Sequence, residues 1–214
     1  MSAGTKRSNR PPKLEEPMVW VSSADRTPSV SAAWITRPRV GETESGDTVI
    51  VRRHGSGVLV VVVDALGHGP RAADVARTST AWLDTAPSTA GAPGIVQGLH
   101  RALHGSRGAA ALVMHLSASG IEACSVGNVE LRSITGRLPF VLTPGVLGVR
   151  LRSPKVSFVE SPAAERFVLF SDGISGRFDL KSLRSHSPPE VASHIFASHR
   201  HAHDDATVVV VDVA

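Results

Sequence analysis

Two valine-rich runs constrain the fold of this chain more than any other feature of its sequence. One run covers residues 57–64 and ends in Asp64, and the other covers residues 207–212 and ends in Asp212. β-Branched side chains follow one another in both runs, without the polar alternation that is typical of a half-exposed strand. Both runs therefore predict strands that are buried on both faces.

The rest of the chain supplies further strands and three helical segments. Strands are expected at 29–36, 48–53, 109–117, 120–126, 129–134, 138–142, 156–160 and 166–170, and helices from Pro70 and at 95–103 and 189–198. This order, with two neighbouring helices early and one late, predicts an α+β fold in which helices cover sheets. Residues 1–17 are polar, charged and proline-rich, which predicts a disordered tail. Residues 18–214 are then expected to form a single domain.

Composition points to the cytoplasm. Hydrophobic residues make up 42% of the chain, enough for a sizeable core, but no apolar stretch approaches the ~20 residues that a membrane span needs. The basic start is followed by no apolar segment, so it does not resemble a secretory signal. A single cysteine, Cys124, excludes an internal disulfide framework and fits a reducing compartment, where we interpret it as a small core residue.

The net charge of +4 raises the alternative of a nucleic-acid partner. The basic residues are scattered or lie in the tail, aromatic residues are only 4%, and tyrosine is absent, so base-stacking platforms are hard to assemble. Nucleic acid is therefore the third choice. An acidic or phosphorylated protein partner suits the charge better.

Aspartates stand at the ends of several predicted strands. Asp64 ends the first valine run, Asp172 follows the apolar strand 166–170, Asp204 precedes the second valine run, and Asp47 precedes strand 48–53. Each one alone favours a turn or a solvated cap. If they converge, the carboxylates repel and raise one another's pKa values, a conflict that one or two hard divalent cations such as Mg²⁺ or Mn²⁺ would remove.

Other chemistry is less well supported by the sequence. Four histidines (His194, His199, His201 and His203) lie near Asp204, but their spacing matches no familiar zinc pattern and a solvated loop is the better interpretation. The P-loop ending and the nucleophile elbow are both absent. His68 has two open interpretations, a general acid or phosphate contact and a packing or hydrogen-bonding residue beside the site.

Several short motifs together resemble a known family, the SpoIIE-type bacterial branch of the metal-dependent type 2C (PPM) protein serine/threonine phosphatases. They are Ser45-Gly-Asp47, Asp64-Ala-Leu-Gly-His-Gly69, Val126-Gly-Asn128, Thr143-Pro-Gly145 with Gly148, Phe170-Ser-Asp-Gly173 and Asp204-Asp-Ala-Thr207. The resemblance implies two antiparallel β-sheets packed as a sandwich and flanked by helices, a four-layer α-β-β-α arrangement. It also implies two Mn²⁺ or Mg²⁺ ions at one end of the sandwich.

The resemblance also implies roles for individual residues. Asp64 would bridge both ions, the carbonyl of Ala65 would bind one of them, and Asp172 and Asp204 would bind the other. Asp47 would act directly or through water. Asp64 and His68 are the catalytic candidates. Ala65 departs from the usual glycine of the family, which matters only if the backbone there needs positive φ.

The expected function is hydrolysis of phosphoserine or phosphothreonine on a regulatory partner protein. The length of the chain is most like that of the RsbX-like phosphatases, which implies a stressosome component, or else an anti-sigma factor antagonist, as the partner. The alternative is a catalytically weak module of the same fold that binds a phosphoprotein without turnover. Retention of Asp64, Asp172 and Asp204 favours the enzyme.

Overall fold

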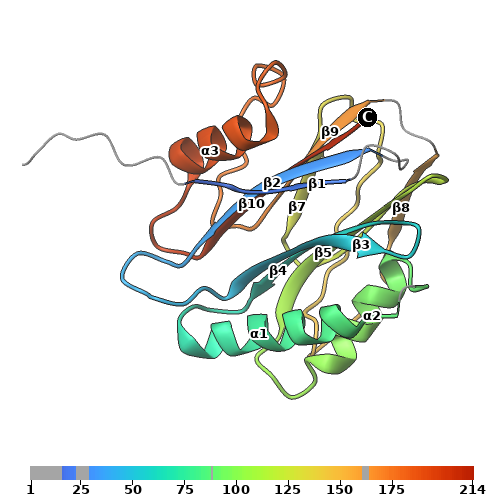
Figure 1. Ribbon diagram of the computed structural model, residues 1–214. Helices are drawn as coiled ribbons and strands as arrows, with labels where there is room; N and C mark the ends of the chain where they lie inside the picture. Colours follow the sequence, from blue (N-terminus) through green and yellow to red (C-terminus); the bar gives the residue numbers. More distant parts are fainter. Residues whose placement is uncertain (1–15, 23–28, 88, 161–163) are drawn as a thin grey trace, which may run out of the picture.

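Two five-stranded antiparallel sheets lie face to face in the computed structural model, which describes residues 16–22, 29–87, 89–160 and 164–214 (Figure 1). Residues 1–15 of the predicted tail lie outside the described residues. The first sheet has the order β1 (Met18–Val21), β2 (Val30–Arg37), β10 (Ala206–Val213), β9 (Glu165–Phe170) and β7 (Glu130–Ser133). The second has the order β3 (Asp47–His54), β4 (Gly57–Ala65), β5 (Ala109–Ser117), β6 (Gly120–Val126) and β8 (Val156–Glu160).

The valine runs form central strands with both faces buried, as predicted. On β4, Val60 and Val62 point into the core between the sheets, whereas Val61 and Val63 point to the opposite face. On β10, alternate valines are likewise shared between the inter-sheet core and an outer core. Since side chains alternate along a strand, an unbroken apolar run is what a strand with cores on both sides requires.

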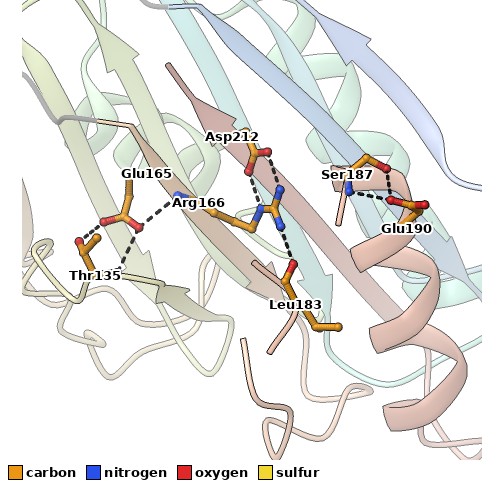
Figure 2. Close-up of polar contacts among 7 residues, drawn as sticks. All are labelled: Thr135, Glu165, Arg166, Leu183, Ser187, Glu190 and Asp212. Atoms are coloured by element: carbon orange, nitrogen blue, oxygen red, sulfur yellow. Dashed lines mark hydrogen bonds and ion pairs between the residues drawn. The ribbon is translucent and has the colours of Figure 1, made fainter. Parts of the chain in front are cut away.

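Helices close the two outer faces. α1 (Pro70–Thr85) and α2 (Ala92–Ala102) cover the second sheet, and α3 (Pro188–His199) covers the first (Figure 1). α3 begins with a capping box, in which Glu190 accepts hydrogen bonds from the backbone and side chain of Ser187, both at 2.7 Å (Figure 2). The predicted α-β-β-α sandwich is confirmed.

One expected strand was wrong and one observed strand was missed. Residues 138–142 form no strand, because Pro139 has no N–H and the N–H of Phe140 bonds the Leu138 carbonyl in a tight turn at 2.8 Å. Leu138 is nevertheless buried in the inter-sheet core, and this explains the apolar pattern. Strand β1 was not predicted. It is a short edge strand whose Met18, Val19 and Val21 are exposed, so it lacks the alternation that marks a half-buried strand.

A largely buried polar cluster ties β9 and β10 together where β9 begins and β10 ends (Figure 2). Arg166 donates from Nε and Nη2 to the two carboxylate oxygens of Asp212, at 2.6 and 2.7 Å, and from Nη1 to the Leu183 carbonyl at 2.9 Å. Glu165 accepts from the backbone N–H groups of Thr135 and Arg166. These partners satisfy one another, so the cluster serves the fold.

No helix among the described residues is long and apolar enough to cross a membrane.

Candidate metal centre

Asp47 and Asp64 face each other across neighbouring strands at one end of the second sheet. They are register partners on β3 and β4. The next pair is hydrogen-bonded, since the N–H of Ala65 donates to the Gly46 carbonyl at 3.2 Å, so Asp47 and Asp64 occupy the closer, non-hydrogen-bonded kind of pair. Asp64 continues the inward alternation of Val60 and Val62. Two carboxylates so placed repel when both are ionised.

The first sheet brings two more carboxylates to the same end. Asp172 lies two residues after β9, and Asp204 lies two residues before β10. The charges of Asp172 and Asp204 both act on Asp64, and the carboxyl groups of Asp64 and Asp172 are within hydrogen-bonding reach of each other. The four aspartates predicted from strand ends thus converge from both sheets.

Neighbouring polar groups hold these carboxylates in place. The Ser171 hydroxyl donates to Asp47 Oδ2 at 2.7 Å and accepts the backbone N–H of Thr207 at 3.0 Å, so it joins the two sheets. Asn128 donates from Nδ2 to Asp172 Oδ2 at 2.6 Å. In the sequence, Asn128 and Ser171 were recognised only as parts of motifs, and no role was predicted for either residue. Their contacts depend on pairs far apart in the chain, which spacing does not reveal.

Electrostatics at this site reflect the crowding of like charges. Burial, followed by the charges of Asp47, Asp172, Asp204 and Asp205, raises the pKa of Asp64 to about 9. Burial also raises the pKa of Asp47 to about 7, against the lowering effect of the Ser171 hydrogen bond. Asp172 is the most exposed of the four predicted ligands. Partial burial and the charge of Asp204 raise its pKa, while the Asn128 hydrogen bond opposes the rise.

Asp205 has a structural role that the adjacent pair Asp204-Asp205 did not predict. Its buried carboxylate accepts the backbone N–H of Arg39 at 2.7 Å and that of Gly46 at 2.6 Å. Gly173 packs directly against it, since a Cβ there would lie 1.9 Å from the Asp205 carbonyl oxygen. Asp205 therefore fixes the loops that carry Asp47 and Asp172, whereas Asp204 stays partly exposed beside the cluster.

The backbone at Ala65 does not need the positive φ that would favour the glycine usual at this position. Ala65 is the last residue of β4 and has the extended conformation that any residue adopts, so its Cβ brings no strain. The N–H groups of its register neighbours are engaged elsewhere: Gly46 donates to Asp205 Oδ2 and Ala109 donates to the Leu147 carbonyl at 3.2 Å. Neither neighbour competes for the Ala65 carbonyl oxygen.

His68 lies outside the cluster of aspartates, on the exposed loop between β4 and α1. Its Nδ1 contacts Glu42 Oε1 at 3.0 Å, and its Nε2 contacts Nη1 of Arg39. Because a guanidinium can only donate, Nε2 must accept, which leaves the proton on Nδ1 to be donated to Glu42. The side chain is therefore oriented by two polar contacts in this structure and not by packing.

The donor set suits hard divalent cations. It consists of carboxylate oxygens with raised pKa values and a carbonyl oxygen that no neighbouring strand uses, which are the ligands that Mg²⁺ and Mn²⁺ favour. Within the described ranges, no three His, Cys, Asp or Glu side chains are already arranged tightly enough to enclose an ion. The described part of the histidine-rich segment provides no zinc site either.

Known structures place this fold among the type 2C protein phosphatases. One similar structure, from work on the bacterial stressosome as a modular system adapted to control secondary messenger signalling, has 29% sequence identity and a TM-score of 0.78, covering 85% of this chain and 98% of that one. The PP2C phosphatase domain of SpoIIE from Bacillus subtilis, with a fragment of its regulatory domain, has 18% identity and a TM-score of 0.68, covering 86% of this chain and 63% of that one. The chain has the PP2C phosphatase fold.

Within that class, the structure resembles RsbX. The crystal structure of RsbX in complex with magnesium has 17% identity and a TM-score of 0.75, and the match covers 92% of this chain and all of that one (100%). No family model matches the sequence. No curated protein matches it either. The fold that the short motifs implied is thus confirmed.

Proposed function

We propose that this chain is a metal-dependent protein phosphatase that hydrolyses phosphoserine or phosphothreonine on a regulatory partner protein in the cytoplasm. One observation carries the proposal: the two sheets of a PP2C fold bring Asp47, Asp64, Asp172 and Asp204 to the same end of the sandwich, where their charges oppose one another. Such a cluster is costly without cations. RsbX, which has the same fold, was crystallised with magnesium.

In this proposal, two Mn²⁺ or Mg²⁺ ions are held by the four aspartates and the Ala65 carbonyl. Bound there, they would supply the positive charge that lowers the pKa of a water and stabilises charge on a phosphoryl group. Asp64 lies between Asp47 of its own sheet and Asp172 of the other, which supports a bridging position for it. Ser171, Asn128 and Asp205 hold the carboxylates and loops in place.

His68 is assigned a supporting catalytic role. Glu42 fixes its tautomer and Arg39 lies against its Nε2 atom. On the exposed loop that follows Asp64, an oriented imidazole and a guanidinium together suit contact with a phosphate or its leaving group. We therefore expect His68→Ala to cost less activity than Asp64→Asn.

A second candidate function is a binding module that holds a phosphoprotein without turnover. The exposed loop that carries His68, together with Arg39 and Arg107, which contact this loop from other segments, would serve such a module equally well. The four converging aspartates favour the enzyme, because a phosphate-binding site gains nothing from repelling carboxylates. Hydrolysis of para-nitrophenyl phosphate with Mn²⁺, and its loss on chelation, separates the two functions.

The partner we propose is a phosphorylated stressosome component, with an anti-sigma factor antagonist as the alternative. Likeness to RsbX and to the stressosome-derived structure supports this choice, as does the net charge of +4. In the test, the Mn²⁺-loaded protein is incubated separately with phosphorylated stressosome scaffold and sensor proteins and with a phosphorylated antagonist, and the rates of phosphate release are compared. Faster turnover of the scaffold or sensor is expected. Faster turnover of the antagonist alone would reassign the chain to a SpoIIE-like role.

A further inference from the structure

The outer edge of β7 offers unpaired backbone groups. β7 is the last strand of the first sheet and pairs only with β9. The N–H of Ile134 donates to the Arg166 carbonyl at 3.1 Å, so even-numbered residues of β7 face β9. The N–H and C=O groups of Leu131 and Ser133 therefore point away from the sheet. No described residue bonds them, so they form a short template for another strand.

A groove of about 530 Å³ runs along this edge. Its apolar lining comes from both sides: Leu138 and Phe140 from the segment after β7, and Phe178 and Leu180 from the loop after β9. Arg132 forms part of its wall, with its guanidinium 5.1 Å from the centre of the Phe178 ring. An apolar groove beside free backbone groups is the arrangement by which proteins bind an extended peptide as an added strand.

The strand that borders the groove begins close to the candidate metal centre. Asn128, which contacts Asp172, lies two residues before the start of β7. Leu131 and Ser133 are three and five residues beyond Asn128, which corresponds to roughly 10 to 17 Å at about 3.3 Å per residue. A chain with its phosphorylated residue at the aspartates could therefore reach the groove without a bend.

The charge on the groove indicates an acidic occupant. Arg132 and Lys181 line it; Arg132 lies 3.9 Å from the Glu130 carboxylate, whereas Lys181 makes no ion pair within the described part of the chain. Its one lining carboxylate, Asp179, accepts the backbone N–H of Lys181 at 3.0 Å. Cations beside apolar side chains favour a segment in which acidic and apolar residues alternate.

We infer that the β7 groove binds an extended segment of the phosphoprotein substrate as an added antiparallel strand. The inference rests on the phosphatase function proposed above and names the part of the substrate that this chain recognises. Every strand pair in both sheets is antiparallel, and antiparallel pairing is the more stable kind. Because β7 runs away from the aspartates, an antiparallel segment runs toward them. The recognised residues therefore lie about three to six positions before the phosphoserine.

The test uses synthetic phosphoserine peptides with alternating valine and glutamate at the third to sixth positions before the phosphoserine. One reference peptide has glycine and serine there. Two others carry N-methyl groups on alternate residues of the stretch, in the two possible frames. The Asp64→Asn protein, which is not expected to turn peptides over, is titrated with each of them in a fluorescence anisotropy assay.

The valine-glutamate peptide is expected to bind on the order of tenfold more tightly than the glycine-serine peptide, since it alone fills the groove and pairs with the cations. One N-methyl frame should abolish this gain and the other should not, because only alternate N–H groups of an added strand face β7. In hydrogen exchange, the Leu131 and Ser133 amides should become protected in the complex. Equal binding of all four peptides, or amides that stay unprotected, would overturn the inference.

A matched pair of protein variants tests the charge. Lys181→Glu is expected to raise KM for the valine-glutamate peptide by about three- to tenfold without changing kcat. Lys155→Glu makes the same change at an exposed residue outside the groove lining and should behave like the wild type. Equal effects of both variants would mean that only net charge matters, which contradicts a β7 site.

Para-nitrophenyl phosphate separates failure of this inference from failure of the proposed function. This small substrate does not reach the groove, so all groove variants should hydrolyse it as the wild type does. Normal hydrolysis with no peptide preference would reject the groove and keep the phosphatase. Absence of Mn²⁺-dependent hydrolysis in the wild type would reject the phosphatase itself.

Discussion

Replacing Asp64 with asparagine is expected to stabilise the metal-free protein at neutral pH. Burial and the surrounding carboxylates raise the pKa of Asp64 from 3.8 to about 9 in the folded protein. Between these two values the folded state holds a proton that the unfolded state has released. Stability of the metal-free protein therefore falls as pH rises from about 4 to about 9. Asparagine imitates the protonated side chain and removes this cost.

The magnitude follows from the width of the pH interval. Each pH unit between the two pKa values costs about 1.4 kcal/mol, so at pH 7 the cost is at most about 4 kcal/mol. An amide replaces the protonated carboxyl imperfectly, since its two donors meet acceptors that were arranged for one proton. We therefore expect Asp64→Asn to add about 2 to 4 kcal/mol to the free energy of unfolding at pH 7, and close to none at pH 4.

Urea unfolding in the presence of EDTA, followed by tryptophan fluorescence at pH 4, 5.5, 7 and 8.5, measures this difference. Asp84→Asn is the control, because it removes one exposed carboxylate on α1 that is not among the charges acting on Asp64. It should change the free energy of unfolding by no more than about 0.5 kcal/mol at any of these pH values. An Asp64→Asn curve parallel to that of the wild type across the pH range would refute the convergence of the carboxylates.

Three further variants test separate parts of the structure. Asn128→Ala removes the donor to Asp172 and should weaken Mn²⁺ binding by about ten- to a hundredfold in calorimetric titration; unchanged affinity would deny Asn128 a positioning role. Glu42→Gln should lower kcat for a phosphopeptide about as much as His68→Ala, and the double variant should be no worse than either, because Glu42 acts through His68. Additive losses would contradict this. Arg166→Met leaves the half-buried Asp212 carboxylate without its partner and should cost about 1 to 3 kcal/mol of stability in urea, with Mn²⁺ affinity unchanged.

Much of the fold could be predicted because its central strands are buried on both sides. The unbroken valine runs of β4 and β10 identify strands between two cores, and Pro70 marks the start of α1. The apolar pattern gave a wrong strand at residues 138–142, where Leu138 is buried in the core and Phe140 packs against it while the backbone turns. It also failed at β1, an exposed edge strand.

The candidate site, like the fold, could be predicted only in part. Asp47, Asp64, Asp172 and Asp204 could be predicted because each stands at the end of an apolar strand, and the structure brings them together. Their assignment as metal ligands stays a prediction. The different parts of Asp204 and Asp205 could not be read from two adjacent carboxylates, since they depend on which one accepts the N–H groups of the Arg39 and Gly46 loop.

Roles that depend on distant contacts could not be predicted either. Ser171 and Asn128 reach carboxylates on other strands, and the orientation of His68 depends on Glu42, 26 residues earlier. The concern about Ala65 is removed by its place in an extended strand, a property of the backbone that the neighbouring sequence did not establish.

Metal-dependent release of phosphate from a phosphoserine peptide tests the central claim most directly. The protein is first freed of metal with EDTA, then titrated with Mn²⁺, while phosphate release and bound Mn²⁺ are measured in the same samples. The account predicts no release without metal, activity that rises as two ions bind per chain, and loss of both binding and activity in the Asp64→Asn variant. Phosphate release that is the same in EDTA and in Mn²⁺, or that survives in the Asp64→Asn variant, would contradict it.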